Sequence, residues 1–126
     1  FLHRANNKRN NVWGLVGGTN EDCETPWEGL RREITEEIGE VIIKKTIPLE
    51  TFVSNDTRFH FHTYLCLIDK EFIPQLNNEH DGYAWCTFNK WPKPLHYGLQ
   101  NTLNRKNNLN KLKTVFEVID LVNENE

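Results

Sequence analysis

The chain has 126 residues, of which 37% are apolar and 26% charged, values typical of a folded domain and not of a disordered segment. Its net charge of −3 gives no general attraction for nucleic acid, and no apolar run is long enough to cross a bilayer. The three cysteines are widely spaced and odd in number, which argues against a disulfide framework and favours a reducing, cytoplasmic setting. We therefore expect one domain, residues 1–126, with one core.

The N-terminal segment alternates apolar stretches with polar loops. Phe1–Arg4 is predicted to be the end of a strand whose earlier residues are missing, so that the first strand is truncated. A polar loop, Ala5–Asn11, separates this strand from a short apolar segment, Val12–Val16. Gly17 and Gly18 end that segment, because paired glycines favour a turn.

The best-determined element is a helix that begins after Thr25. Thr25 is a capping residue, Pro26 suits the first helical position, and Glu28 completes a capping box. Gly39 is expected to end the helix in a left-handed conformation. Apolar residues at spacings of three and four form one stripe along it: Trp27, Leu30, Ile34 and Ile38.

Further elements are predicted downstream of this helix. The strands expected from β-branched and alternating apolar residues are Val41–Ile47, ended by Pro48, then Glu50–Val53, Phe59–Ile68 and Tyr83–Phe88. Leu95–Leu103 is expected to be a helix that Asn107-Asn108 interrupts, and Leu109–Ile119 a second helix, although 114–119 also fits a strand. Phe59, Phe61 and Phe88 are expected in the core. Short strands mixed with two or three helices indicate an α/β sandwich.

The helix carries an arc of carboxylates that its own architecture does not explain. Glu33, Glu36 and Glu37 lie on one arc beside the apolar stripe, with no basic partner expected on it. Like charges at these spacings cost roughly 0.2–0.5 kcal/mol per pair, so a solvated acidic face is the ordinary interpretation. The arc, however, borders the core-facing stripe and adjoins the turn at Gly17 and Gly18, whose carbonyls can point into the same space. Carboxylate and carbonyl oxygens are what Mg²⁺ requires.

The spacing of these residues resembles the Nudix box, G-x5-E-x7-R-E-U-x-E-E-x-G-U, where U is aliphatic. The matching positions are Gly18, Glu24, Arg32, Glu33, Ile34, Glu36, Glu37 and Gly39. The last aliphatic position departs from the pattern because it is Glu40, although Val41 follows and can pack in its place. The preceding segment, 13–18, is similar to the family's W-G-x-P-G-G sequence, with Val16 in place of proline. A motif of this length is far more specific than a short one.

The resemblance implies a Nudix-type α/β/α sandwich with a mixed sheet and hydrolysis of a nucleoside diphosphate linked to another group. It implies Mg²⁺ (or Mn²⁺) as cofactor. The implied metal ligands are Glu33, Glu36, Glu37 and the carbonyl of Gly17 or Gly18. Glu24 and Arg32 would form a structural ion pair that holds the loop against the helix. Such a metal lowers the pKa of a bound water, and a carboxylate then removes its proton.

A further carboxylate is expected from the polar segment 77–82. In several Nudix enzymes a similar loop, a few residues before a tryptophan, supplies an additional glutamate to the metal cluster. Glu79 stands six residues before Trp85 and is the closest match, both as a ligand and as the water-activating base. His80 and Asp81 are the alternatives, and an ordinary exposed loop is the other interpretation.

Other residues are candidates for substrate binding. Arg4 and Arg58 suit phosphate because arginine binds it bidentately, and Trp85 suits either base stacking or burial. His60 and His62 share one strand face, but no third zinc ligand is evident, so a pocket or surface role is preferred.

Two functions remain open from the sequence. The first is an active pyrophosphohydrolase for a small nucleoside diphosphate derivative: an ADP-ribose-like compound, a dinucleoside polyphosphate or a nucleoside triphosphate. The second is a catalytically silent module that binds a nucleotide. All three box carboxylates, Glu33, Glu36 and Glu37, are present, which favours the first. Neither a membrane nor nucleic acid is an expected partner, and a homodimer is left open.

Overall fold

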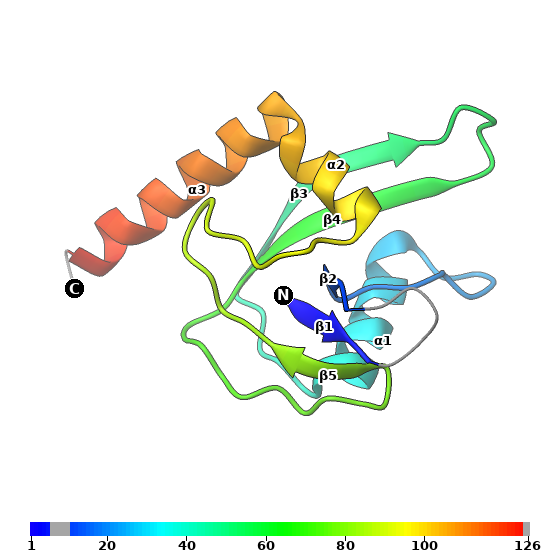
Figure 1. Cartoon of the computed structure of the whole chain (residues 1–126), viewed down its shortest axis with the longest axis horizontal. Helices are drawn as coiled ribbons and strands as arrows, with labels where there is room; N and C mark the ends of the chain where they lie inside the picture. Colours follow the sequence, from blue (N-terminus) through cyan, green and yellow to red (C-terminus); the bar gives the residue numbers. More distant parts are fainter. Residues whose placement is uncertain (6–10, 125–126) are drawn as a thin grey trace.

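The computed structural model describes residues 1–5 and 11–124 (Figure 1), so positions 6–10 of the expected polar loop lie outside the described residues. The strands are β1 (Leu2–Arg4), β2 (Trp13–Gly14), β3 (Lys45–Val53), β4 (His60–Leu67) and β5 (His80–Tyr83). The helices are α1 (Pro26–Ile38), α2 (Tyr97–Asn104) and α3 (Lys106–Glu124). Over the described ranges, no helix has both the length and the apolar character needed to span a membrane.

The strands form two antiparallel sheets. One has the order β2-β1-β5, and the other is the hairpin β3-β4. A mixed sheet was expected, which requires parallel pairing. Among the described residues, the parallel pairing is one isolated bridge between Trp13 and Leu95. Because β1 lies in the centre of its sheet, the pairing places Arg4 opposite His80.

Helices cover both faces of β4. Two successive residues of the strand, which point to opposite faces, show this α/β/α layering. Tyr64 makes an edge-on ring contact with Trp27 of α1, with centroids 5.7 Å apart. Leu65, which points to the other face, packs against the buried cluster of Leu99, Leu103 and Leu112 from α2 and α3. The expected sandwich is therefore confirmed.

The boundaries of β3 differ from those predicted. The strand begins at Lys45 instead of Val41 and continues through Pro48 to Val53. Pro48 is accommodated because the register shifts between Pro48 and Glu50, and a proline without an N–H is tolerated at such an irregularity. The expectation that Pro48 ends the strand was wrong.

β5 is also displaced from the predicted strand Tyr83–Phe88. It runs from His80 to Tyr83 because these residues pair with its partner strand β1. Arg4 of β1 pairs with His80, and Leu2 of β1 pairs with Tyr83. One further backbone hydrogen bond, from the Ala84 N–H to the Phe1 carbonyl, follows the strand.

The break between the C-terminal helices lies at Arg105 and not at Asn107-Asn108, which are part of α3. Asn108 is buried, and its side-chain amide donates to Glu50 Oε2 at 2.7 Å and to the Thr102 carbonyl at 2.9 Å. A buried asparagine with two partners stabilises this helix junction. Residues 114–119 are helical, so the strand alternative is wrong.

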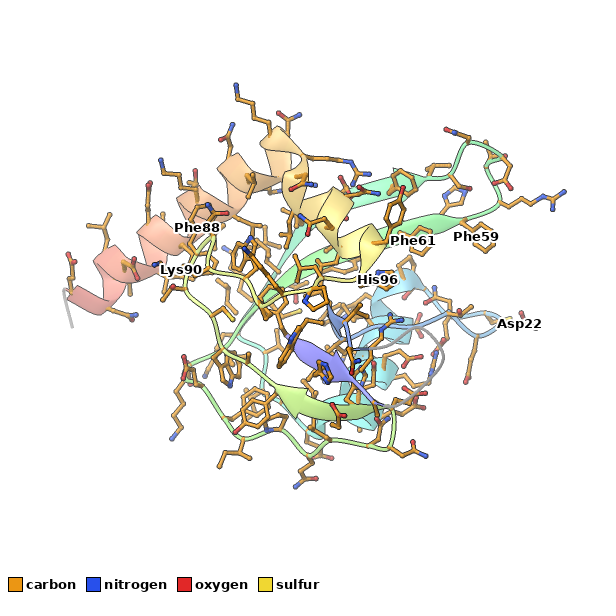
Figure 2. All side chains as sticks on the ribbon, viewed as in Figure 1. Asp22, Phe59, Phe61, Phe88, Lys90 and His96 are labelled. Atoms are coloured by element: carbon orange, nitrogen blue, oxygen red, sulfur yellow. The ribbon has the colours of Figure 1, made fainter. Side chains whose placement is uncertain are left out.

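Two of the three phenylalanines expected in the core are exposed. Phe59 is 59% and Phe61 56% exposed, and their rings stack on each other with centroids 6.3 Å apart. Figure 2 shows both at the outer end of the hairpin, where β4 extends beyond the helices that cover its inner half. Phe88 instead packs against the buried leucine cluster, as expected.

Candidate active site

The start of α1 is set by the predicted capping box. The Glu28 N–H donates to Thr25 Oγ1 at 3.2 Å, and the Thr25 N–H donates to Glu28 Oε1 at 3.1 Å. The helix ends at Gly39, whose φ of 91° lies in a region that L side chains avoid. Its ψ of −170° is extended, whereas a left-handed cap has a positive ψ. The expected left-handed conformation is therefore found in φ but not in ψ. These caps fix which residues of α1 face the glycine turn.

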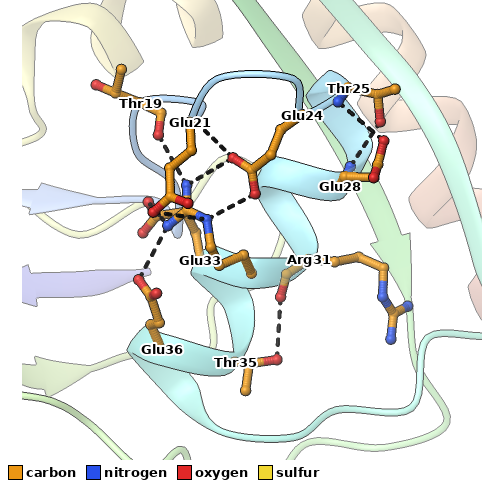
Figure 3. Close-up of polar contacts among 10 residues, drawn as sticks. Thr19, Glu21, Glu24, Thr25, Glu28, Arg31, Glu33, Thr35 and Glu36 are labelled. Atoms are coloured by element: carbon orange, nitrogen blue, oxygen red, sulfur yellow. Dashed lines mark hydrogen bonds and ion pairs between the residues drawn. The ribbon is translucent and has the colours of Figure 1, made fainter.

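The Arg32 guanidinium connects the loop that precedes α1 to the helix. Its partners Thr19, Glu24, Glu33 and Glu36 are labelled in Figure 3. The Arg32 Nε and Nη2 donate to the two carboxylate oxygens of Glu24 at 2.9 and 3.1 Å, and Nη2 also donates to the Thr19 carbonyl at 3.0 Å. The Arg32 hydrogen bond lowers the pKa of the Glu24 carboxyl. The ion pair expected between these two residues is therefore present.

Arg32 also contacts two of the box carboxylates, which the sequence interpretation did not anticipate. Its Nη1 donates to Glu33 Oε1 at 3.0 Å and to Glu36 Oε2 at 3.3 Å. The expectation that the acidic arc has no basic partner was wrong, because the arginine side chain curls back along its own helix and offers donors to several acceptors. Arg32 thus offsets part of the repulsion between Glu33 and Glu36.

The glycine turn approaches α1 closely. A Cβ atom on Gly18 would lie 2.3 Å from Glu33 Oε1, whereas a Cβ on Gly17 would meet nothing within 4 Å. The Gly17 N–H donates to Glu37 Oε2 at 3.0 Å. A side chain at position 18 would therefore displace the Glu33 carboxylate, and Gly17 contacts Glu37 through its amide.

Glu37 is the most buried of the three arc carboxylates, with 2% of its surface exposed. This burial raises the pKa of Glu37 to about 7, and the neighbouring Glu33 and Glu79 carboxylates add to the rise. The Gly17 N–H and the positive charge of Arg4 act in the opposite direction. Among the described residues no arginine is ion-paired with Glu37, and a carboxylate that is costly to ionise is a favourable place for a cation.

The structure brings Glu37 together with two residues of the segment 77–82. One ligand atom each from Glu37, Glu79 and His80 lies within 4.8 Å of the others, and this is the single group of three potential ligands among the described residues. Glu33 and Glu36 are outside this group. His60 and His62 are not part of a group of three potential ligands within the described part of the chain.

The residues predicted to bind substrate are not all close to this group. Arg4 pairs with His80 across β1 and β5, and its positive charge opposes the rise in the pKa of Glu37 and adds to the lowering of the pKa of His80 that burial causes. Arg58 is exposed in the turn between β3 and β4, which lies at the far side of the molecule from β5 in Figure 1. The Trp85 indole N–H donates to the Phe72 carbonyl at 3.1 Å, and the two rings are 5.3 Å apart.

Two further residues of the segment were weighed as alternatives to Glu79. Asp81 Oδ1 lies 2.5 Å from His3 Nδ1, so this carboxylate is already engaged. His80 is buried, which sequence reasoning missed because the strand was expected to begin only at Tyr83. The residues before Tyr83 are polar, and this pattern does not predict that the side chain of His80 is buried.

The chain is similar to known proteins in both sequence and structure. A family model described as the NUDIX domain matches residues 1–105. The chain belongs to the Nudix family. Members of this family generally use a divalent metal, and the buried Glu37 beside Glu79 supplies the oxygen donors that such an ion takes.

Two Nudix relatives indicate the range of similarity. Dihydroneopterin triphosphate diphosphatase of Haemophilus influenzae is 33% identical, over 62% of this chain and 59% of that protein. The aligned region thus spans about three fifths of that relative. The crystal structure of a MutT NUDIX hydrolase from Burkholderia pseudomallei superposes with a TM-score of 0.60 at 21% identity, over 83% of this chain and 84% of the other. The second likeness supports the Nudix fold.

Proposed function

We propose that this Nudix protein is a divalent-metal-dependent pyrophosphohydrolase that cleaves a nucleoside diphosphate linked to another moiety. The observation that carries the proposal is the position of Glu37. Its carboxylate is buried, has no ion-paired arginine in the described part of the chain, and has a second carboxylate and an imidazole within 4.8 Å. A bound divalent cation offsets the cost of this arrangement, which a solvated acidic surface does not have.

The residues of the site fit a metal of the Mg²⁺ or Mn²⁺ type. Glu37 and Glu79 would hold it together with Glu33, Glu36 and a carbonyl of the turn at Gly17 or Gly18. The buried imidazole of His80, whose Nδ1 has no hydrogen-bond partner among the described residues, lies beside them. When bound, such an ion neutralises phosphate oxygens and lowers the pKa of water.

The protein groups divide the remaining tasks. Gly17 holds one oxygen of Glu37, which leaves the other oxygen facing the ligand group. Glu79 is exposed, so it can accept a proton from an attacking water and release it to solvent. Arg4 is exposed beside the site and is the arginine best placed to bind the substrate's phosphates. Arg58 and Trp85 remain predictions, because their hydrogen bonds among the described residues are to Asp56 and Phe72 and not to the ligand group.

The substrate class follows from the chemistry and not from a pocket. ADP-ribose-like compounds, dinucleoside polyphosphates and nucleoside triphosphates all present the linkage to be cleaved. The similarity to a dihydroneopterin triphosphate diphosphatase adds a pterin triphosphate to these candidates. A small-molecule substrate agrees with the absence of a general positive charge, since the chain is acidic overall.

One observation favours the alternative of a catalytically silent nucleotide-binding module. Arg32 already pairs with Glu33 and Glu36, so two of the box carboxylates are partly neutralised without metal. In a metal-dependent enzyme, Glu33 and Glu36 would exchange their contacts with Arg32 for contacts with the cation when it binds. A silent module would keep them and bind nucleotide without turnover.

The deciding experiment incubates the protein with each candidate substrate in Mg²⁺ or Mn²⁺ and resolves phosphate, pyrophosphate and nucleoside monophosphate. Turnover that stops in excess EDTA and in Glu37→Gln supports the proposal. Nucleotide binding without product in either metal supports the silent module. Hydrolysis that is equal with and without EDTA contradicts the metal-dependent mechanism.

A further inference from the structure

His80 lies at the start of β5 in an environment that its hydrogen bonds do not explain. The residue is 9% exposed, and its Nδ1 is buried without a hydrogen-bond partner among the described residues. Its Nε2 is 4.0 Å from Glu37 Oε1, which is beyond hydrogen-bond length. Neither ring nitrogen therefore has a hydrogen bond from the described part of the chain.

A buried imidazole in this state is costly. Buried polar groups are nearly always paired, and leaving one unpaired costs about 1–3 kcal/mol. Glu37 and Glu79 offer carboxylate oxygens on the side of the ring that Nε2 faces. A divalent cation accepts electron pairs from both carboxylate and imidazole, so it can bind His80 Nε2 together with these oxygens, and the ring proton then stays on Nδ1.

The spacing of the ligand atoms agrees with this assignment. Ligand bonds of about 2.1 Å place two donors on one ion at separations of up to about 4.2 Å. The 4.0 Å between His80 Nε2 and Glu37 Oε1 falls within this reach, whereas it is too long for a direct hydrogen bond. Glu79 lies within the same 4.8 Å group from the neighbouring position in the chain.

We propose that His80 is a nitrogen ligand of the metal site formed with Glu37 and Glu79, and that this site therefore prefers a divalent transition ion to Mg²⁺. The inference rests on the proposed function only in placing a cation at Glu37. Oxygen-only sites suit Mg²⁺, and an added imidazole shifts the preference toward ions that bind nitrogen well. The box glutamates alone carry no such preference.

The first test uses the wild-type protein after removal of metal by chelation. Titration calorimetry with Mg²⁺, Mn²⁺ and Co²⁺ gives the affinities, and pulsed EPR of the Mn²⁺ complex detects ¹⁴N coupling from a directly bound imidazole. We expect ¹⁴N coupling and a Co²⁺ affinity at least about 10-fold above that for Mg²⁺. Mn²⁺ bound without ¹⁴N coupling overturns the proposal.

The second test identifies the histidine. We expect His80→Asn to abolish the ¹⁴N coupling and to lower Co²⁺ affinity by about 10-fold or more, with Mg²⁺ affinity changed by less than about 3-fold. His62→Asn is the matched control, because His62 is exposed and its Nδ1 contacts the Thr51 hydroxyl. Coupling that survives in a folded His80→Asn protein overturns the assignment.

If His80→Asn does not fold, the remaining histidines decide the question. The chain has five, and the other four are His3, His60, His62 and His96. Coupling that persists when each of these is replaced singly assigns the ligand to His80, and coupling lost in any one of them overturns the proposal. Failure of the inference is distinguishable from failure of the function, since metal-dependent hydrolysis without ¹⁴N coupling refutes only the role of His80.

Discussion

The Gly17 N–H donates a hydrogen bond of 3.0 Å to Glu37 Oε2, across 20 positions of the sequence. This contact joins the glycine turn to the last turn of α1. It holds one oxygen of a buried carboxylate, while the other oxygen faces His80 at 4.0 Å. The orientation of Glu37 is therefore decided by the turn before the helix as well as by the helix.

The buried Glu37 makes the stability of the metal-free protein depend on pH. Burial raises its folded-state pKa to about 7 from an ordinary value near 4.5. A raised pKa contributes stability that is complete below pH 4.5 and is lost as pH rises through 7, by up to about 3 kcal/mol. Divalent metal should restore stability above pH 7 and have little effect near pH 5. Chemical denaturation across this range, with Glu37→Gln as reference, measures the contribution. A pH-independent difference between the two proteins contradicts it.

Glu37→Gln should separate activity from stability. The variant keeps an acceptor for the Gly17 N–H but removes a charge from the site, so we expect kcat to fall by about 10²-fold or more at saturating Mg²⁺. Without metal at pH 8 the variant should be more stable than the wild type by about 1–3 kcal/mol, because no buried charge has to form. Steady-state kinetics and urea unfolding test the two effects. An unchanged kcat would mean that Glu37 is not a ligand of the catalytic metal.

The two glycines of the turn should respond differently to alanine. In Gly18→Ala the new Cβ would lie 2.3 Å from Glu33 Oε1, so the Glu33 side chain must move away. We expect a loss of activity on the order of 10–10²-fold with little change in melting temperature, because a flexible side chain can yield. Gly17→Ala is the control, since its Cβ meets nothing within 4 Å. Equal losses in both variants would refute a specific role for the approach of Gly18 to Glu33.

Three substitutions in the segment 77–82 rank the candidates for the base. In Mg²⁺ we expect Glu79→Gln to lose more activity than Asp81→Asn or His80→Ala. Glu79 is exposed within the ligand group, whereas Asp81 is engaged by His3. Loss of a ligand should be partly rescued by more metal, whereas loss of the base should flatten the ascending limb of the pH–rate profile. If His80→Ala is the most damaging of the three in Mg²⁺, the base is the imidazole.

Asn108 should matter for stability but not for chemistry. It is buried at the start of α3 and donates to Glu50 and to the Thr102 carbonyl. Asn108→Ala removes two hydrogen bonds from a buried amide, whereas Arg105 still donates to Glu50 and to the Thr102 carbonyl, so we expect a loss of about 1–2 kcal/mol in unfolding free energy. Asn107→Ala, at the exposed neighbouring position, should change stability by less than about 0.5 kcal/mol. Similar effects in both variants would contradict the role of the buried amide.

Local interactions made α1 predictable. The capping box joins residues three apart, the apolar stripe repeats at three and four, and Gly39 terminates the helix, so each signal lies within a few residues of what it specifies. The Nudix box is a pattern of the same kind, since its glutamates share one helix. The ion pair of Arg32 with Glu24 also follows from one short segment.

Features that depend on contacts between residues far apart in the chain were decided only by the tertiary structure. β5 begins at His80 because β1 pairs with it there, and that register buries His80 beside Glu37. Phe59 and Phe61 alternate like core residues but are exposed, because the hairpin extends beyond the helices. Periodicity states which side chains share a face, but whether another element covers that face is set by long-range pairing. The sequence by itself therefore determined the helix and the family, whereas the meeting of Glu37, Glu79 and His80 required the fold.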